Sequence, residues 1–103
     1  MSTATMQGSE GKVVSIQTGC VLDLSAFETI LSASDLANTP ETSSIEVDLG
    51  KTLHIRDSGV AMLQLLRKLT RWTCPIRLVN LDPVVHYRIT TSRIGTQFQF
   101  AVH

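Results

Sequence analysis

The sequence has 103 residues, a length that suits one domain. Hydrophobic residues make up 43% and charged residues 17%, which favours a packed core over disorder. Nine Lys and Arg balance nine Asp and Glu, so the chain lacks the excess positive charge that steers proteins to nucleic acid.

The N-terminal segment predicts a tail rather than a leader. Residues 1–11 are small and polar and lack the hydrophobic stretch of a secretory signal. We therefore expect a flexible tail over residues 1–11 and a single domain over residues 12–103. No apolar run approaches the roughly 20 residues that span a bilayer. We expect a cytoplasmic protein with no membrane or nucleic-acid partner, in which Cys20 and Cys74 are free thiols.

The first half of the domain begins with two predicted strands and a helix. Lys12–Gln17 is short and β-branched, and residues 20–24 predict a second strand antiparallel to it. Ser25 and Glu28 have the spacing of a capping box, which predicts a helix from Ser25 to about residue 37. Pro40 lies just beyond this helix, and a proline cannot continue it.

A third strand and the longest helix follow. Residues 43–49 alternate apolar and acidic side chains, which predicts a half-buried strand. Asp57 or Ser58 is the expected N-cap of a helix over residues 60–71. Its apolar positions are expected to face inward and its polar positions to face water. These are Met62, Leu63, Leu65, Leu66 and Leu69 on the inner side, and Gln64, Arg67, Lys68 and Arg71 on the outer side.

The last third predicts a strand, a helix and a strand. Ile76–Val79 is a short apolar strand, and Asp82-Pro83 places an N-cap and a first-turn proline at the start of a helix over residues 84–92. Residues 96–102 alternate Phe98, Phe100 and Val102 on one side. The order of these strands and helices along the chain predicts an α/β fold with a mixed sheet of about five strands and three to four helices.

One stretch carries a family resemblance. Residues 44–80 contain Asp48-Leu49 at a strand end, a short apolar segment, Ser58-Gly59 at a helix start, and Leu78-Val79-Asn80 after the next strand. This pattern resembles STAS domains of the anti-sigma factor antagonist family. The resemblance covers roughly residues 19–100 and is weakest upstream of residue 44.

The resemblance implies a regulatory binding protein and not an enzyme. In regulatory members the serine before the glycine accepts phosphate, and the matching residue is Ser58. The implied partner is an anti-sigma factor or serine-protein kinase of the histidine-kinase-like ATPase type, with a PP2C-like phosphatase that resets the switch. No cofactor or metal is implied. The expected contact surface comprises His54, Ile55, Arg56, Asp57, Ser58, Gly59, Val60 and Met62.

Two positions depart from the family pattern. An acidic residue and then a hydroxyl often precede the family's serine, whereas this chain has Arg56 and Asp57 there. The small, glycine-rich turn after the second helix is replaced by Trp72-Thr73-Cys74-Pro75. We expect the tryptophan either to pack beneath the turn or to form an exposed anchor for a partner.

Other interpretations stay open at this stage. Asp57-Ser58-Gly59 could be helix capping alone. The chain could be a STAS module that is never phosphorylated and docks to a transporter or lipid-transport complex. A small hydrolase, with Ser58 and His54 as a nucleophilic pair, or a nucleotide-binding protein lacks supporting motifs, since no oxyanion motif or complete phosphate loop is present. The three histidines show no zinc-ligand spacing with the two cysteines.

Overall fold

A five-stranded sheet forms the centre of the structure, a computed structural model that describes residues 3–7 and 12–100. The strands lie in the order β1-β2-β4-β6-β7, with β1 antiparallel to β2 and the others parallel. Their bounds are Thr3–Gln7 (β1), Lys12–Gln17 (β2), Thr42–Asp48 (β4), Ile76–Val79 (β6) and Gln99–Phe100 (β7). The predicted mixed α/β sheet is confirmed.

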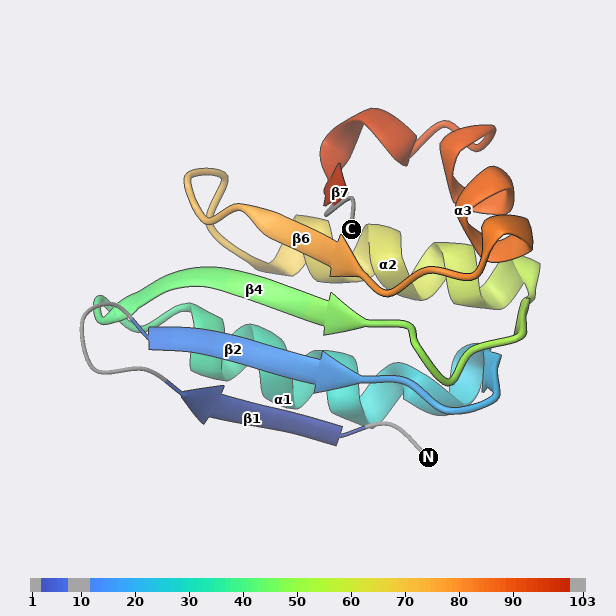
Figure 1. The fold of residues 1–103 in the computed structure, drawn as a ribbon. Coiled ribbons are helices and arrows are strands. Elements are labelled where there is room, and N and C mark those ends of the chain that lie inside the picture. The colour runs from blue at the N-terminus through green and yellow to red at the C-terminus, as the bar shows by residue number, and fades with distance from the viewer. Residues whose placement is uncertain (1–2, 8–11, 101–103) are drawn as a thin grey trace.

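Within the described residues, three helices and a second, two-stranded sheet complete the fold (Figure 1). Helices α1 (Phe27–Ala37) and α2 (Asp57–Leu69) cover one face of the sheet, and α3 (Pro83–Thr90) lies at one end. The second sheet pairs β3 (Val21–Leu22) with β5 (His54–Ile55) in parallel. Two 3-10 turns, η1 (Leu24–Ala26) and η2 (Gly95–Gln97), precede α1 and β7.

The strand registers explain why the sheet has one apolar face. Two rows of buried side chains cross it toward the helices: Val14, Ile45 and Ile76, and then Ile16, Val47 and Leu78. Between them a polar row joins Ser15, Glu46, Arg77 and Gln99 on the opposite face. Because side chains alternate along a strand, one face packs against α1 and α2 while the other remains polar.

The N-terminal prediction is wrong for residues 3–7, which form β1 instead of a tail. Pairing with β2 supplies partners for the backbone groups of a segment with little apolar pattern of its own. Residues 1–2 and 8–11 of the predicted tail lie outside the described residues. Residues 20–24 are also not a strand antiparallel to β2, because Val21–Leu22 pairs in parallel with β5.

The capping box predicted at Ser25 does not form. Asp23 is the N-cap of η1, and its carboxylate accepts hydrogen bonds from the hydroxyl and the backbone N–H of Ser25. Helix α1 then begins at Phe27 directly from η1, with no side-chain cap. The hydroxyl of Ser25 is thus already bonded within the preceding turn, which leaves it unavailable to cap α1.

The two other helices keep their predicted places but differ in detail. Asp82 caps α3 as predicted, accepting the N–H of Val84 at 2.9 Å. Helix α2 starts earlier than predicted, at Asp57, and ends at Leu69. The prediction that Arg67 faces water is wrong. Its side chain is buried, and its Nη2 donates to the carbonyl of Arg71, which lies just beyond the end of α2.

The predicted C-terminal strand is shorter in the structure. Residues 95–97 form η2, and β7 spans Gln99–Phe100. Phe98 is buried and Phe100 half-buried, so the predicted apolar side of this segment does face the core up to Phe100. Val102 lies outside the described residues.

Candidate functional site

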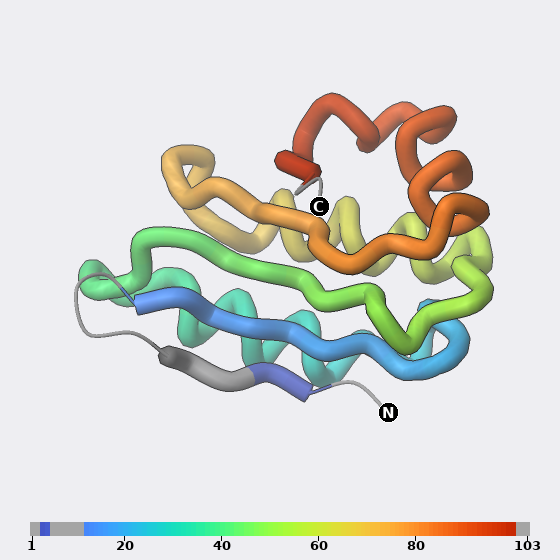
Figure 2. Tube along the Cα trace, in the orientation of Figure 1, coloured from blue at the N-terminus to red at the C-terminus, as the bar shows by residue number. Residues whose placement is uncertain are grey.

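Ser58 is the second residue of α2, and the helix begins where a β-strand ends. Strand β5 leads through Arg56, the N-cap, into Asp57 and Ser58. The connections after β2 and after β4 come together at the same end of the molecule as α3, which Figure 2 shows as one cluster of loops. The candidate site is this end of α2, with β3, β5, η1 and α3 around it.

The Ser58 hydroxyl takes part in a contact between two segments. Its Oγ accepts a hydrogen bond from the backbone N–H of Leu24, at 3.2 Å, and the side chain is half-buried. Neither Ser58 nor Asp57 caps α2, because both lie inside the helix and Arg56 occupies the cap position with an extended backbone. The predicted N-cap is therefore wrong by one to two residues, while the predicted serine at a helix start is correct.

Gly59 allows α2 to lie directly against β3. A Cβ placed on Gly59 would stand 2.1 Å from the carbonyl oxygen of Leu22, a contact that real Cβ atoms do not make. That same carbonyl accepts the N–H of Arg56 at 3.0 Å. The Ser58-Gly59 pair thus has a structural reason: the glycine permits the close approach that brings Leu24 to the serine.

A polar network holds the connection between β4 and β5. The carboxylate of Asp48 accepts the N–H of Gly50 at 2.8 Å and the amide of Asn80 at 3.2 Å. The fully buried hydroxyl of Thr52 donates to the carbonyl of Gly19 at 2.6 Å and shares a hydrogen bond with the Thr18 hydroxyl. These bonds fix the segment that leads to Ser58 to the ends of β2, β4 and β6.

Replacing Thr52 by valine is expected to destabilise the protein by about 1–3 kcal/mol, because the Gly19 carbonyl loses the hydrogen bond from Thr52 and the buried Thr18 hydroxyl keeps only its bond to the Asp48 carbonyl. Urea unfolding followed by circular dichroism measures this change. Thr73→Val, at an exposed position, serves as the control and should change stability by less than about 0.5 kcal/mol. Equal stabilities for the two variants would contradict a structural role for the Thr52 hydroxyl.

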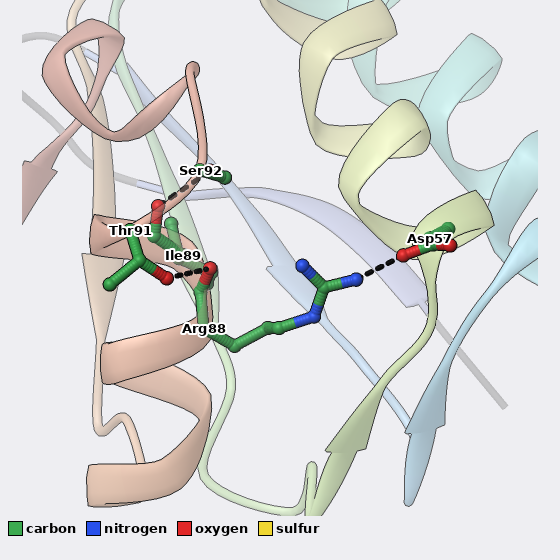
Figure 3. Close-up of polar contacts among 5 residues, drawn as sticks. All are labelled: Asp57, Arg88, Ile89, Thr91 and Ser92. Atoms are coloured by element: carbon green, nitrogen blue, oxygen red, sulfur yellow. Dashed lines mark hydrogen bonds and ion pairs between the residues drawn. The ribbon is translucent and has the colours of Figure 1, made fainter.

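Asp57 forms an ion pair across the site with Arg88 of α3 (Figure 3). The Asp57 side chain is 97% exposed, and the Arg88 guanidinium reaches it from the facing helix. The end of α3 that carries Arg88 is held by side-chain caps: Thr91 donates to the Arg88 carbonyl at 3.3 Å, and Ser92 to the Ile89 carbonyl at 2.6 Å.

The site therefore holds two acidic and two basic groups close to Ser58. Hydrogen bonds from the hydroxyl and then the backbone N–H of Ser25 lower the pKa of Asp23, and the Arg56 charge lowers it further. The negative charges of Asp23 and Asp57 are thus balanced by the positive charges of Arg56 and Arg88. Sequence reasoning missed Arg88, because no local pattern links two residues that are 31 positions apart.

Exposed apolar side chains surround the polar centre. Leu24, Leu53 and Val84 are 62%, 55% and 69% exposed, and they come from η1, the loop before β5 and α3. Between β5 and α3 lies a hollow of about 130 Å³, lined by Leu53, His54, Ile55, Val84, Val85 and Arg88. Exposed apolar groups beside a polar centre are typical of protein contact surfaces.

The predicted contact residues divide into three groups. His54, Arg56 and Asp57 are exposed, and Ile55, Ser58 and Val60 are half-buried. Gly59 and Met62 are buried and cannot contribute side-chain contacts, since Gly59 faces β3 and Met62 faces the core. The prediction that these eight residues contact a partner stays a prediction, and the six that are exposed or half-buried are the accessible ones.

Three further features bear on the predictions made from the sequence. Over residues 3–7 and 12–100, no three His, Cys, Asp or Glu side chains gather closely enough to hold a metal ion. Cys20 is exposed, Cys74 is buried, and both are free thiols. None of the helices in these ranges combines the length and the apolar character needed to cross a membrane.

Comparison with solved structures decides the fold. SpoIIAA, an anti-sigma factor antagonist, matches in its unphosphorylated form with a TM-score of 0.66 over 98% of this chain and 89% of its own, at 17% identity. An anti-sigma factor antagonist from Mycobacterium paratuberculosis matches with a TM-score of 0.74 over 100% of this chain and 87% of its own, at 13% identity. The chain has the SpoIIAA-like fold.

The SpoIIAA-like fold confirms the resemblance predicted from residues 44–80. The Bacillus cell fate determinant SpoIIAA in its phosphorylated form matches equally well, with a TM-score of 0.66 over 98% of this chain and 93% of its own, at 17% identity. No protein-family model matches the sequence, and no curated protein matches it. The likeness is therefore one of structure, carried by the sheet order and the helices that cover it.

Proposed function

We propose that this chain is an anti-sigma factor antagonist that binds an anti-sigma factor and is switched by phosphorylation of Ser58. The observation that carries the proposal is the position of Ser58 at the start of α2 in a SpoIIAA-like fold. SpoIIAA itself occurs in unphosphorylated and phosphorylated forms. The accessible polar centre with its apolar rim supports a docking surface at this position.

The proposed switch acts through charge. A phosphate on Ser58 adds about two negative charges at neutral pH. The helix N-terminus favours an anion, so the domain itself tolerates the modification. A docked partner does not, because the phosphate would place bulk and charge between Leu24 and the first turn of α2, where the Ser58 hydroxyl now lies. Binding and release thus follow the modification state of one side chain.

The proposed partners follow from this role. The kinase is an anti-sigma factor or serine-protein kinase of the histidine-kinase-like ATPase type, and a PP2C-like phosphatase restores the hydroxyl. The chain performs no chemistry of its own in this scheme, which takes place in the cytoplasm. The constitutive alternative, a STAS module docked to a transporter or lipid-transport complex, differs in leaving Ser58 unmodified.

The direct experiment incubates the purified protein with a candidate kinase and ATP and locates the phosphate by mass spectrometry. The proposal expects one phosphate on Ser58, and no incorporation into Ser58→Ala. Analysis of the protein isolated from its own cells extends the test. Phosphate on a different serine would contradict the assignment to Ser58, and no phosphate under conditions that change sigma factor activity would favour the constitutive alternative.

Arg88 is expected to lower the second pKa of phosphoserine 58 by roughly a few tenths of a unit, because its positive charge pairs with the neighbouring Asp57 and favours the more negative form of the phosphate. Titration of the phosphorylated protein by phosphorus NMR measures this pKa. Arg88→Gln should raise it, whereas Arg93→Gln, which removes an exposed arginine with no ion pair among the described residues, should not. Identical titration curves for wild type and Arg88→Gln would show that Arg88 does not sense the phosphate.

A further inference from the structure

A second hollow lies at the opposite end of α2 from Ser58. It measures about 340 Å³ and lies between the loop that joins α2 to β6 and the segment from η2 to β7. In Figure 1 that loop is at the end of the molecule away from α3. This volume falls within the range of small-ligand sites, roughly 300–1,000 Å³. None of the described residues that line it is acidic.

Arg67 provides the hollow with a buried cation. Its side chain is only 7% exposed, and its Nη2 donates to the carbonyl of Arg71 and to the hydroxyl of Thr70. Its Nε is buried and has no acceptor. Within the described part of the chain no carboxylate lies within 4 Å of this guanidinium. A buried cationic donor without an acceptor lowers the stability of the folded protein. An anion bound beside the guanidinium would offset this cost.

Trp72 provides a planar surface beside that cation. It is 82% exposed, which is rare for the largest apolar side chain, and its ring lies 5.6 Å from the Arg67 guanidinium carbon. Phe98 and Ile76 form apolar parts of the same hollow, and Gln97 offers a neutral hydrogen-bonding group. An exposed indole face beside such a hollow suits the stacking of a second ring.

We propose that this hollow binds a small ligand that combines a planar ring with a carboxylate or phosphate group. The acidic group would lie against the guanidinium of Arg67 where that residue lines the hollow, and the ring would lie along Trp72. The proposal does not depend on the function proposed for Ser58. Helix α2 has 13 residues and is therefore about 20 Å long, so ligand and protein partner can bind at the same time.

Nuclear magnetic resonance gives a direct test, because Trp72 is the one tryptophan in the chain and its indole N–H signal needs no assignment. The probes are naphthalene-2-carboxylate and AMP, added to the full chain. We expect saturable shifts of the Trp72 indole and Arg67 Nε–H signals, with a dissociation constant of about 1 mM or below. Tighter binding of the carboxylate would point to an aromatic acid, and tighter binding of AMP to a nucleotide.

Controls separate the two halves of the ligand. Naphthalene-2-carboxamide lacks the charge and acetate lacks the ring, so each should bind at least fivefold more weakly than the carboxylate. Trp72→Ala and Arg67→Lys should weaken binding at least tenfold, and Lys68→Gln, a charge change on the exposed side of the same helix, should not. Because Trp72 is exposed, its variant remains informative if Arg67→Lys unfolds, with the Arg67 Nε–H signal as the readout once the indole is absent. The absence of saturable shifts up to 10 mM of either probe, or equal binding of acetate, would overturn the proposal.

Discussion

Phosphorylation of Ser58 is expected to weaken binding of the cognate anti-sigma factor by roughly 30-fold to several-thousand-fold. The reason is that a charge left unpaired in a protein contact costs about 2–5 kcal/mol, and each 1.4 kcal/mol is a factor of ten. The net charge of the group formed by Asp23, Arg56, Asp57 and Arg88 is zero before modification and about two units more negative after it.

Ser58→Asp tests this expectation without the kinase. Isothermal titration calorimetry with the anti-sigma factor compares wild type, Ser58→Ala and Ser58→Asp. The alanine variant should bind within about tenfold of wild type, because it loses only the hydrogen bond from the Leu24 N–H. The aspartate variant carries one negative charge instead of two, so it should show a smaller loss than phosphate.

A matched control separates a local effect from a general one. Ser32→Asp adds the same charge at an exposed position on α1 and should leave the affinity unchanged. If Ser58→Asp binds as tightly as Ser58→Ala, the proposed switch is wrong, whatever the fold. If both bind weakly, the hydroxyl is needed for docking and the charge is not the cause.

The sequence predicts the main elements because their signals are local. Lys12–Gln17 and Ile76–Val79 are short apolar strands, and both are strands in the structure with those bounds. The Asp82-Pro83 helix start is confirmed because the cap and the proline act within one turn. Of the apolar positions of α2 predicted to face inward, Met62, Leu63 and Leu66 are buried, Leu65 is half-buried, and Leu69 in the last turn is 38% exposed, which contradicts the prediction for that residue.

The elements that the sequence does not predict depend on distant partners. Strand β1 exists through its pairing with β2, and β3 and β5 are two-residue strands that stabilise each other. A short stretch of sequence does not reveal such a pairing, because the partner strand lies elsewhere in the chain. Arg67 is misplaced for the same reason: helical periodicity puts it on the outer face, but the carbonyl of Arg71 beyond the helix end draws it inward.

The candidate site likewise combines residues that the local sequence predicts with residues that distant segments supply. Ser58 at a helix start is predictable from the chain alone, together with the exposed His54 and Arg56 beside it. The ion pair to Arg88, the rim residue Leu24 and the rim residue Val84 are not, because three separate segments supply them. The sequence identifies Ser58 as the candidate for modification, and the fold determines which residues surround it.

Gly59→Ala is expected to destabilise the protein by about 2–4 kcal/mol. This change in stability is opposite in direction to the one that helix propensity alone predicts. Gly59 lies in α2, where alanine is favoured over glycine by about 1 kcal/mol, so helix propensity alone predicts a more stable protein. The new methyl group, however, would stand 2.1 Å from the Leu22 carbonyl oxygen. Relieving that overlap separates α2 from β3 and strains the bond between that carbonyl and the Arg56 N–H.

Urea unfolding of wild type and Gly59→Ala measures the difference. Gly50→Ala is the control, because the nearest atom to its new methyl group is a carboxylate oxygen of Asp48 at 3.0 Å, a tight contact that a shift of a few tenths of an ångström relieves. Its stability should change by less than about 1 kcal/mol. A Gly59→Ala protein more stable than wild type would show that α2 and β3 are not in close contact. The glycine would then have no part in holding Leu24 against Ser58, and the surroundings proposed for the phosphorylation site would lose their structural basis.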